Sequence, residues 1–177
     1  MENPSPKSGF RIWIDADACP LPAKEIIYRY AFKWNIEITL VANSHQKIPK
    51  FHSIKLVVVS KGLDVADHYI CQNIMPDDIV ITADIPLASD IIKANAHVIT
   101  PKGETLDTRN ISERLSVRNF FDHLRSSGQH HSRSASYDNG HKKAFAASID
   151  KLVTKLRNAQ LLRERDLKTK LDGQEKP

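Results

Sequence analysis

The sequence predicts an α/β protein built on a mostly parallel sheet with helices on both of its faces. Short apolar runs alternate with longer segments whose apolar residues recur at helical spacing, which is the pattern of strand–helix–strand units. The runs at 55–60 and 78–83 are almost continuously apolar, as strands covered on both faces of a parallel sheet are. We therefore expect a three-layer α/β/α fold with a mostly parallel five-stranded sheet, followed by C-terminal helices.

The expected strands are short runs rich in β-branched residues between turn-forming residues. They lie at 11–15, 36–43, 53–60, 77–83 and 97–100. Helices are expected where apolar residues recur every three or four positions. They lie at 20–34, 61–75, 84–96 and 110–127, with a last one from about Lys142. One face of that last helix is apolar, so we expect it to pack on its own domain.

The length of 177 residues suits one domain. We expect this domain at 11–157, after a disordered lead-in at 1–10. Polar residues at 127–141 predict a flexible loop, and 158–177 predicts a charged tail that frays or is disordered. The formal charge of +5 and the isoelectric point of about 9.2 are compatible with RNA as a partner but do not identify one.

Composition argues against several classes of protein. No apolar run approaches the roughly 20 residues of a membrane span, so no membrane partner is expected. The first ten residues lack the apolar segment of a secretory signal. Cys19 and Cys71 have no neighbouring cysteine at metal-binding spacing, which argues against a zinc site or disulfide scaffold and favours a cytoplasmic protein. Cys19 fits a reactive helix-start thiol or a packing residue, and packing is favoured because no base stands beside it.

Acidic and polar residues follow the ends of the expected strands. Because parallel strands end at one edge of a sheet, these side chains should converge there. Close carboxylates repel one another, and Mg²⁺ or Mn²⁺ relieves that repulsion. Two such ions can activate a water for phosphodiester hydrolysis. We expect the metal ligands to be Asp15, Asp17, Asp64, Asp67 and Asp84, with Asp15, Asp17 and Asp84 catalytic and Asn43, Ser60, Lys61 and Thr82 facing the substrate.

A simpler interpretation of each carboxylate stands beside this one. Asp64 and Asp84 each precede a helix, where aspartate is a favourable N-cap. Asp67 suits the positive end of a helix dipole. Asn43 and Lys61 are explained equally well by turns. The pair Asp15 and Asp17, directly after a buried strand, is harder to explain by capping.

The stretches "RIWIDADACP", "KGLDVAD" and "VITADIPLA" resemble the YaiI/YqxD family of uncharacterised bacterial proteins, over about residues 11–156. That family is similar in pattern to PIN/NYN-type nucleases. The resemblance implies a PIN-like, Rossmann-like fold and metal-dependent cleavage of RNA. It places ligands at Asp64, Asp67 and Asp84, and leaves open whether Asp15 or Asp17 is the main first-strand ligand.

Two other functions remain open at this stage. In a haloacid-dehalogenase-like phosphohydrolase, Asp15 would be the nucleophile and Asp17 the acid/base. The residues "ACP" after the aspartates and the lack of an evident cap domain count against it. A non-catalytic RNA-binding or regulatory module is the other alternative, because a sequence shows ligands but not their geometry. The oligomeric state is not indicated.

Overall fold

The structure, a computed structural model, describes residues 9–126 and 136–172. In this part of the chain a six-stranded sheet has the order β3-β2-β1-β4-β5-β6. Neighbouring strands are parallel except for β5 and β6. The predicted mostly parallel α/β sheet is confirmed. The strands are β1 (Ile12–Asp15), β2 (Ile38–Ala42), β3 (Ile54–Val58), β4 (Ile79–Ile81), β5 (His97–Ile99) and β6 (Thr105–Leu106).

The expected count of five strands is wrong because β6 was missed. This strand has two residues, which is too short to show the alternation that marks a strand in a sequence. The five expected helices are present: α1 (Leu21–Trp34), α2 (Val65–Asn73), α3 (Ile85–Lys93), α4 (Ile111–Ser126) and α5 (Asn139–Asp172).

Three expectations about irregular segments need correction. Phe10, assigned to the disordered lead-in, is 1% exposed and belongs to the core. Helix α5 begins at Asn139, so the end of the predicted loop at 127–141 is helical. The same helix continues to Asp172, where a frayed tail was expected. The remainder of the lead-in (1–8), most of the loop (127–135) and residues 173–177 lie outside the described residues.

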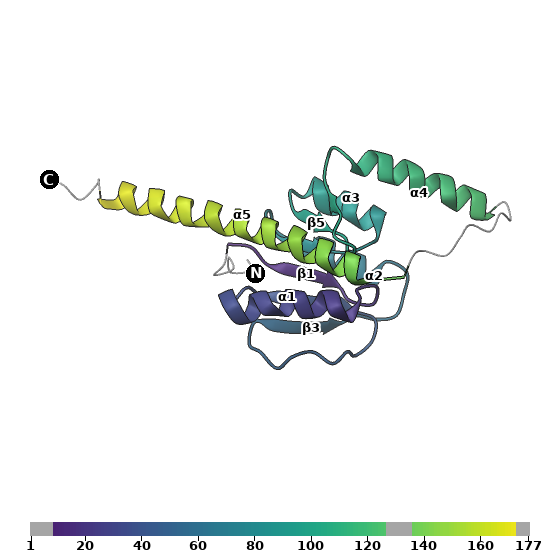
Figure 1. Cartoon of the computed structure of the whole chain (residues 1–177), viewed down its shortest axis with the longest axis horizontal. Coiled ribbons are helices and arrows are strands. Elements are labelled where there is room, and N and C mark those ends of the chain that lie inside the picture. Colours follow the sequence, from purple (N-terminus) through teal and green to yellow (C-terminus); the bar gives the residue numbers. More distant parts are fainter. Residues whose placement is uncertain (1–8, 127–135, 173–177) are drawn as a thin grey trace.

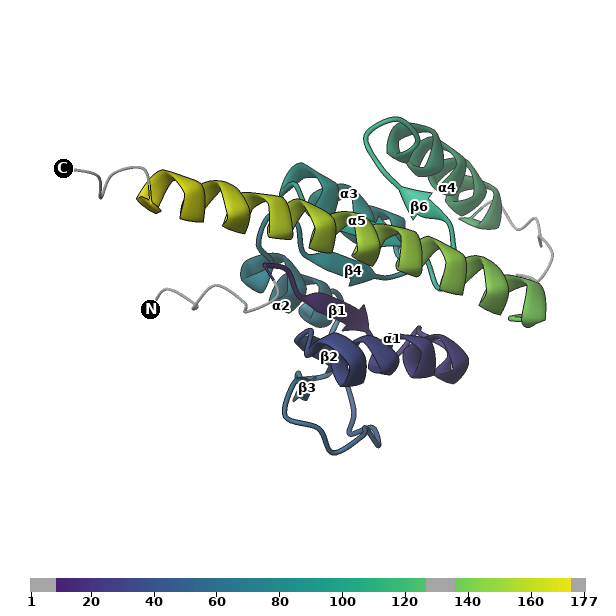
Figure 2. The same ribbon diagram turned by 60° about the vertical axis from the view of Figure 1, so that its left-hand side comes forward.

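Alternate residues of each central strand face opposite sides of the sheet, and each side has its own apolar cluster. Ile12 and Ile14 of β1 join the cluster that includes residues of α1 and α5. Trp13, between them, joins the cluster that includes residues of α2 and α3. Figures 1 and 2 show α1 and α5 on one side of the sheet, with α3 and the protruding α4 on the other. The two-sided burial explains why these strands are almost wholly apolar.

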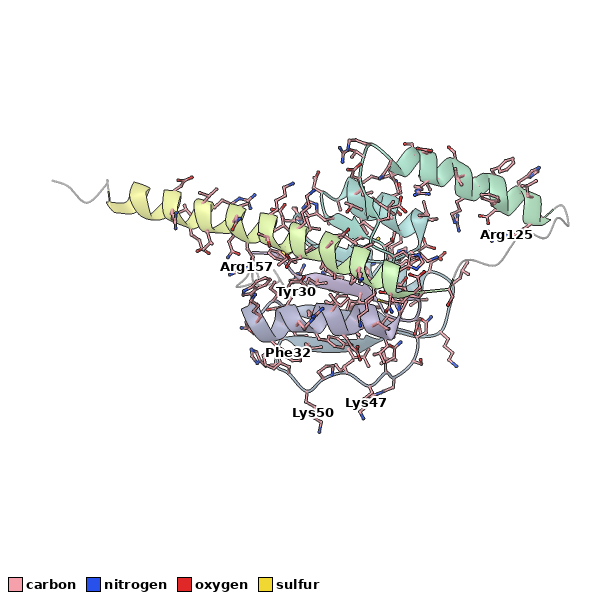
Figure 3. The ribbon with its side chains drawn as sticks, viewed as in Figure 1. Tyr30, Phe32, Lys47, Lys50, Arg125 and Arg157 are labelled. Carbon is pink, nitrogen blue, oxygen red and sulfur yellow. The ribbon has the colours of Figure 1, made fainter. Side chains whose placement is uncertain are left out.

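The prediction that the last helix packs on its own domain is confirmed. Phe145, Ile149 and Val153 of α5 are fully buried in the cluster shared with α1. The guanidinium of Arg157 lies 4.3 Å from the ring centre of Trp34, whose ring is tilted by 35° against that of Tyr30 at 5.4 Å. Figure 3 shows Tyr30 and Arg157 between the two helices, and Lys47 and Lys50 projecting from the β2–β3 connection. None of the helices described is long and apolar enough to cross a membrane.

The beginnings of β1 and β4 are joined by a buried charge pair. Asp78, immediately before β4, is fully buried and accepts hydrogen bonds from the backbone and guanidinium nitrogens of Arg11, at 2.8 and 2.7 Å. It also accepts from the indole nitrogen of Trp13 and the backbone nitrogen of Met75. The carboxylate is therefore well satisfied, as a buried charge must be.

We expect Gly103→Ala to destabilise the fold by about 2 kcal/mol or more. Gly103, in the turn between β5 and β6, has φ +91°, and a Cβ there would lie 2.5 Å from backbone atoms of Ala144 and Phe145. Neither backbone can yield easily, because Phe145 is buried in the core. Urea denaturation measures the loss. Gly140→Ala is the control, since the nearest neighbour of a Cβ there is a side-chain oxygen of Asp138 at 3.1 Å and not backbone; equal losses in the two variants would contradict the expectation.

Candidate functional site

The sheet order reverses between β1 and β4. The chain passes from β1 outward to β3 on one side, and from β4 outward to β6 on the other. In open α/β sheets this reversal leaves a crevice beyond the carboxyl ends of the two strands, and ligands bind there. Asp15 is the last residue of β1, and Thr82 and Asp84 follow β4. The fold therefore places these three residues where a ligand site is expected.

A cavity of about 350 Å³ lies at this edge. Four of the predicted carboxylates line it, and they come from the end of β1, the turn after β1 and the start of α2. Asn43, directly after β2, also lines it. The acidic cavity, as we call it, is lined by Asp15, Asp17, Ala18, Asn43, Gly62, Asp64, Val65, Ala66 and Asp67.

Asp15 is positioned by Thr82. The Thr82 hydroxyl donates to the Asp15 carboxylate at 3.0 Å and accepts from the Asp84 backbone nitrogen at 3.0 Å. Asp84 caps α3 by accepting from the Leu87 backbone nitrogen at 2.8 Å. The capping interpretation of Asp84 is thus correct, although its charge still acts on Asp15. Thr82 is 1% exposed and does not line the cavity, so its contact is with Asp15.

Asp17 is held by Asn43, a predicted site residue, and by Gln46, which the sequence analysis missed. Its carboxylate accepts from the Asn43 backbone nitrogen at 2.6 Å and from the side-chain amide of Gln46 at 3.0 Å. Gln46 in turn accepts from the buried Lys24 ammonium, which also donates to the Ala16 carbonyl. Lys24 lies on the apolar face of α1. A lysine at such a position indicates a buried charge that needs partners, and this could have identified it from the sequence. Gln46 gave no such indication, because it lies in an irregular connection.

Asp64 is not a helix cap. It precedes α2 with φ +58°, a left-handed conformation that aspartate tolerates, and within the described chain its side chain accepts no capping hydrogen bond. The capping interpretation of Asp64 is therefore wrong. Its backbone carbonyl accepts from His68, and Asp67 lies in the first turn of α2. Both side chains are left to line the acidic cavity.

Burial and mutual repulsion raise the pKa values of two carboxyls. The pKa of Asp67 rises to about 6, mainly through burial and then through the charges of Asp84, Asp15 and Asp64. The pKa of Asp15 is also raised, chiefly by burial, although the Thr82 hydrogen bond opposes this. A group of carboxyls at which full ionisation is unfavourable is one that a cation stabilises.

We expect Asp67 to titrate near pH 6 in carboxyl-detected NMR. Added Mg²⁺, which unlike Mn²⁺ is not paramagnetic, should lower that midpoint. Its folded pKa exceeds the ordinary 3.8, so between about pH 4 and 6 the folded state holds the proton more tightly than the unfolded state. Stability therefore falls as pH rises through this window. Asp67→Asn should remove this loss of stability. The melting temperature of the variant, relative to that of the wild type, should therefore rise between pH 4 and pH 7. A constant difference across this range would contradict the expectation.

The other predicted residues lie at the margin of the site. Ser60 and Lys61 are exposed after β3 and do not line the acidic cavity. Cys19 is buried, and burial raises the pKa of its thiol to about 12, so it stays protonated and packs in the core. The packing interpretation of Cys19 is the one that fits.

The carboxylates have the right chemistry for a hard cation but do not form a closed ligand set. Over residues 9–126 and 136–172, no three His, Cys, Asp or Glu side chains stand close enough together to hold a metal ion. Mg²⁺ commonly binds through one or two carboxylates and keeps several waters or substrate phosphate oxygens. Asp15 and Asp67, whose ionised forms are penalised most, are the residues that would hold such an ion.

Fold and cavity together define an α/β protein with an acidic site at the point where its strand order reverses. The chain belongs to the family described as "Uncharacterized BCR, YaiI/YqxD family", whose model matches residues 13–155. It is 43% identical over 146 residues to a UPF0178 protein of Pseudomonas entomophila, covering 82% of this chain and 97% of that one. A UPF0178 protein of Aeromonas salmonicida is 46% identical over 144 residues, covering 81% and 96%. No solved structure matches significantly.

Proposed function

We propose that this protein is a Mg²⁺- or Mn²⁺-dependent nuclease with a PIN-like three-layer fold, and that it hydrolyses phosphodiester bonds in RNA. The observation that carries the proposal is the convergence of four carboxylates on one cavity at the reversal of the strand order. Metal-dependent phosphodiester hydrolysis uses carboxylate ligands together with water and substrate phosphate, and this cavity supplies carboxylates.

The chain's own residues have distinct roles in this proposal. Asp15 and Asp67 would hold the ion, and Asp64 and Asp84 would add negative charge around it. Thr82 fixes the orientation of Asp15, and Gln46 with the Asn43 backbone fixes Asp17. When bound, the ion supplies a Lewis acid that neutralises the phosphate and lowers the pKa of a bound water.

The phosphohydrolase alternative has less support. Its acid/base would be Asp17, and that carboxylate accepts two hydrogen bonds, one on each oxygen. Both contacts hold the carboxylate in one position and occupy its two oxygens. A residue that must give and take a proton gains nothing from such contacts.

The proposal is tested first by calorimetric titration of Mn²⁺ into the wild type and an Asp17→Asn/Asp84→Asn variant. We expect binding by the wild type and at least tenfold weaker binding by the variant. Because phosphate oxygens can complete the shell, the titration is repeated with a non-cleavable oligonucleotide present. Cleavage of single-stranded RNA is then compared with hydrolysis of a phosphatase substrate. Metal-independent RNA binding without turnover would instead favour the non-catalytic module and overturn the nuclease.

A further inference from the structure

A second cavity, of about 510 Å³, opens beside the acidic cavity at the same edge of the sheet. Ala18 lines both cavities. Ala83 and Ile85, which line the second, flank Asp84 in the sequence. The two cavities therefore adjoin across the end of β1 and the segment that carries Asp84. We call the second one the adjoining cavity.

The adjoining cavity has an apolar wall and a positively charged one. Pro20, Ile85, Pro101 and Val117 supply apolar surface. The charged side chains of its lining are Lys102, Arg114, Arg118 and Glu104, which leaves two positive charges in excess. Glu104 forms an ion pair with Arg114, and Arg118 lies 3.6 Å from Asp122. An apolar surface beside a cationic one suits a ligand that joins a flat ring to an anion.

Tyr137 also lines the adjoining cavity, and its hydroxyl is a hydrogen-bonding group. Its hydroxyl oxygen is buried and has no hydrogen-bond partner in the described part of the chain. The ring packs against the core cluster and stacks on His141, with ring centres 5.9 Å apart. Burial raises the pKa of the hydroxyl, so it keeps its proton. A fixed, buried, unpartnered donor is costly unless a ligand satisfies it.

We propose that the adjoining cavity binds one nucleotide unit of a single-stranded nucleic acid, next to the phosphate that occupies the acidic cavity. The base lies against the apolar wall, Arg118 meets the phosphate, and the Tyr137 hydroxyl donates to an oxygen of the same unit. This inference rests on the proposed function, because it assigns a subsite for that substrate. Because both cavities are lined by Ala18, neighbouring units of one strand would occupy them side by side.

The geometry favours a single strand over a duplex. A cavity of about 510 Å³ is of the size that encloses one small ligand. A base can enter it only when it is unpaired, as in single-stranded RNA, whose bases are free to stack on protein surfaces. A duplex offers its phosphates but not its base faces.

The test uses a matched pair of variants on α4. Arg118 and Arg125 both form ion pairs with Asp122, but only Arg118 lines the adjoining cavity; Figure 3 places Arg125 at the end of α4. Fluorescence anisotropy measures binding of a labelled ten-nucleotide 2′-O-methyl RNA in Mn²⁺, with a gel to confirm that it stays intact. We expect Arg118→Gln to weaken binding about tenfold and Arg125→Gln less than twofold.

Tyr137→Phe provides a second readout. It removes only the hydroxyl, so the ring packing and the fold are kept. We expect it to weaken binding three- to tenfold, and not to lower the melting temperature, since the lost hydroxyl has no partner within the described residues. Unchanged affinity in Tyr137→Phe would remove that residue from the subsite and overturn its assignment.

The outcomes separate the subsite from the nuclease. Selective loss in Arg118→Gln supports the subsite even if wild-type protein never cuts RNA, in which case only the nuclease proposal fails. Equal loss of affinity in both arginine variants overturns the subsite, whether or not cleavage occurs. So does an absence of RNA binding by the wild type even with a 100-fold excess of protein over labelled RNA. Duplex RNA binding as tightly as single-stranded RNA also overturns it. So does adenosine monophosphate binding as tightly as the ten-nucleotide strand, because the cavity would then hold a free nucleotide.

Discussion

Asp84→Asn is expected to lower metal-dependent RNA cleavage by about 10²–10³-fold while leaving the fold intact. Asparagine is as good an N-cap as aspartate, so the side chain at position 84 still accepts the hydrogen bond from the Leu87 backbone nitrogen. What is lost is the negative charge that acts on Asp15 and Asp67. The variant therefore separates the electrostatic role of Asp84 from its structural role.

The measurement is the initial rate of cleavage of a single-stranded RNA in Mn²⁺, with thermal melting alongside. Asp90→Asn is the matched control, because Asp90 lies on the same helix but is exposed and paired with Lys93. It should retain the wild-type rate. The Asp67 pKa should fall in Asp84→Asn, since one of the charges that raises it is gone. Wild-type cleavage by Asp84→Asn would show that the site is misplaced.

Asp78→Ala is expected to lower the free energy of unfolding by about 3–5 kcal/mol. The substitution leaves the Arg11 guanidinium, whose side chain is 9% exposed, without its buried partner. It also leaves the indole nitrogen of Trp13 and the Met75 backbone nitrogen without their acceptor. The loss falls at the start of β1 and β4, the two central strands.

Chemical denaturation measures this loss, and Asp77→Asn is its control. Asp77 has φ +69°, which asparagine tolerates. Its partner Arg163 is exposed, and the half-buried His97 lies 3.7 Å from its carboxylate. Exposed pairs contribute about 1 kcal/mol or less. Arg11→Ala combined with Asp78→Ala should cost less than the sum of the two. A loss below about 1 kcal/mol in Asp78→Ala would mean that the pair is replaceable by water.

The sheet and helices followed from the sequence because burial on both faces gives each strand a dense apolar run. Asp15 and Asp84 could likewise be placed at one edge, since parallel strands put their carboxyl ends together. The contacts that position them depend on side chains distant in sequence. Lys24, Gln46 and Asp17 form one chain of hydrogen bonds, and no periodicity relates their positions.

The adjoining cavity could not be predicted from the sequence either. It is formed where α4, the turns after β4 and β5, and Tyr137 come together. The position of α4 depends on its packing against α3. A sequence pattern indicates that a helix has an apolar face but not which element packs against that face. Tyr137 also lies in the segment predicted as a loop, so nothing in the sequence indicated that its hydroxyl is buried.

The course of α5 offers a practical point of attachment. Arg163 of α5 pairs with Asp77, which precedes β4, so the helix leaves the domain at the edge where the strands begin. Figure 1 shows its far part extending beyond the sheet. Leu162, which precedes Arg163 in α5 and is 60% exposed, thus lies at the end of the sheet opposite the acidic cavity. A fluorophore or surface linker attached through Leu162→Cys should leave the carboxyl edge open, which makes the protein suitable for immobilised binding measurements.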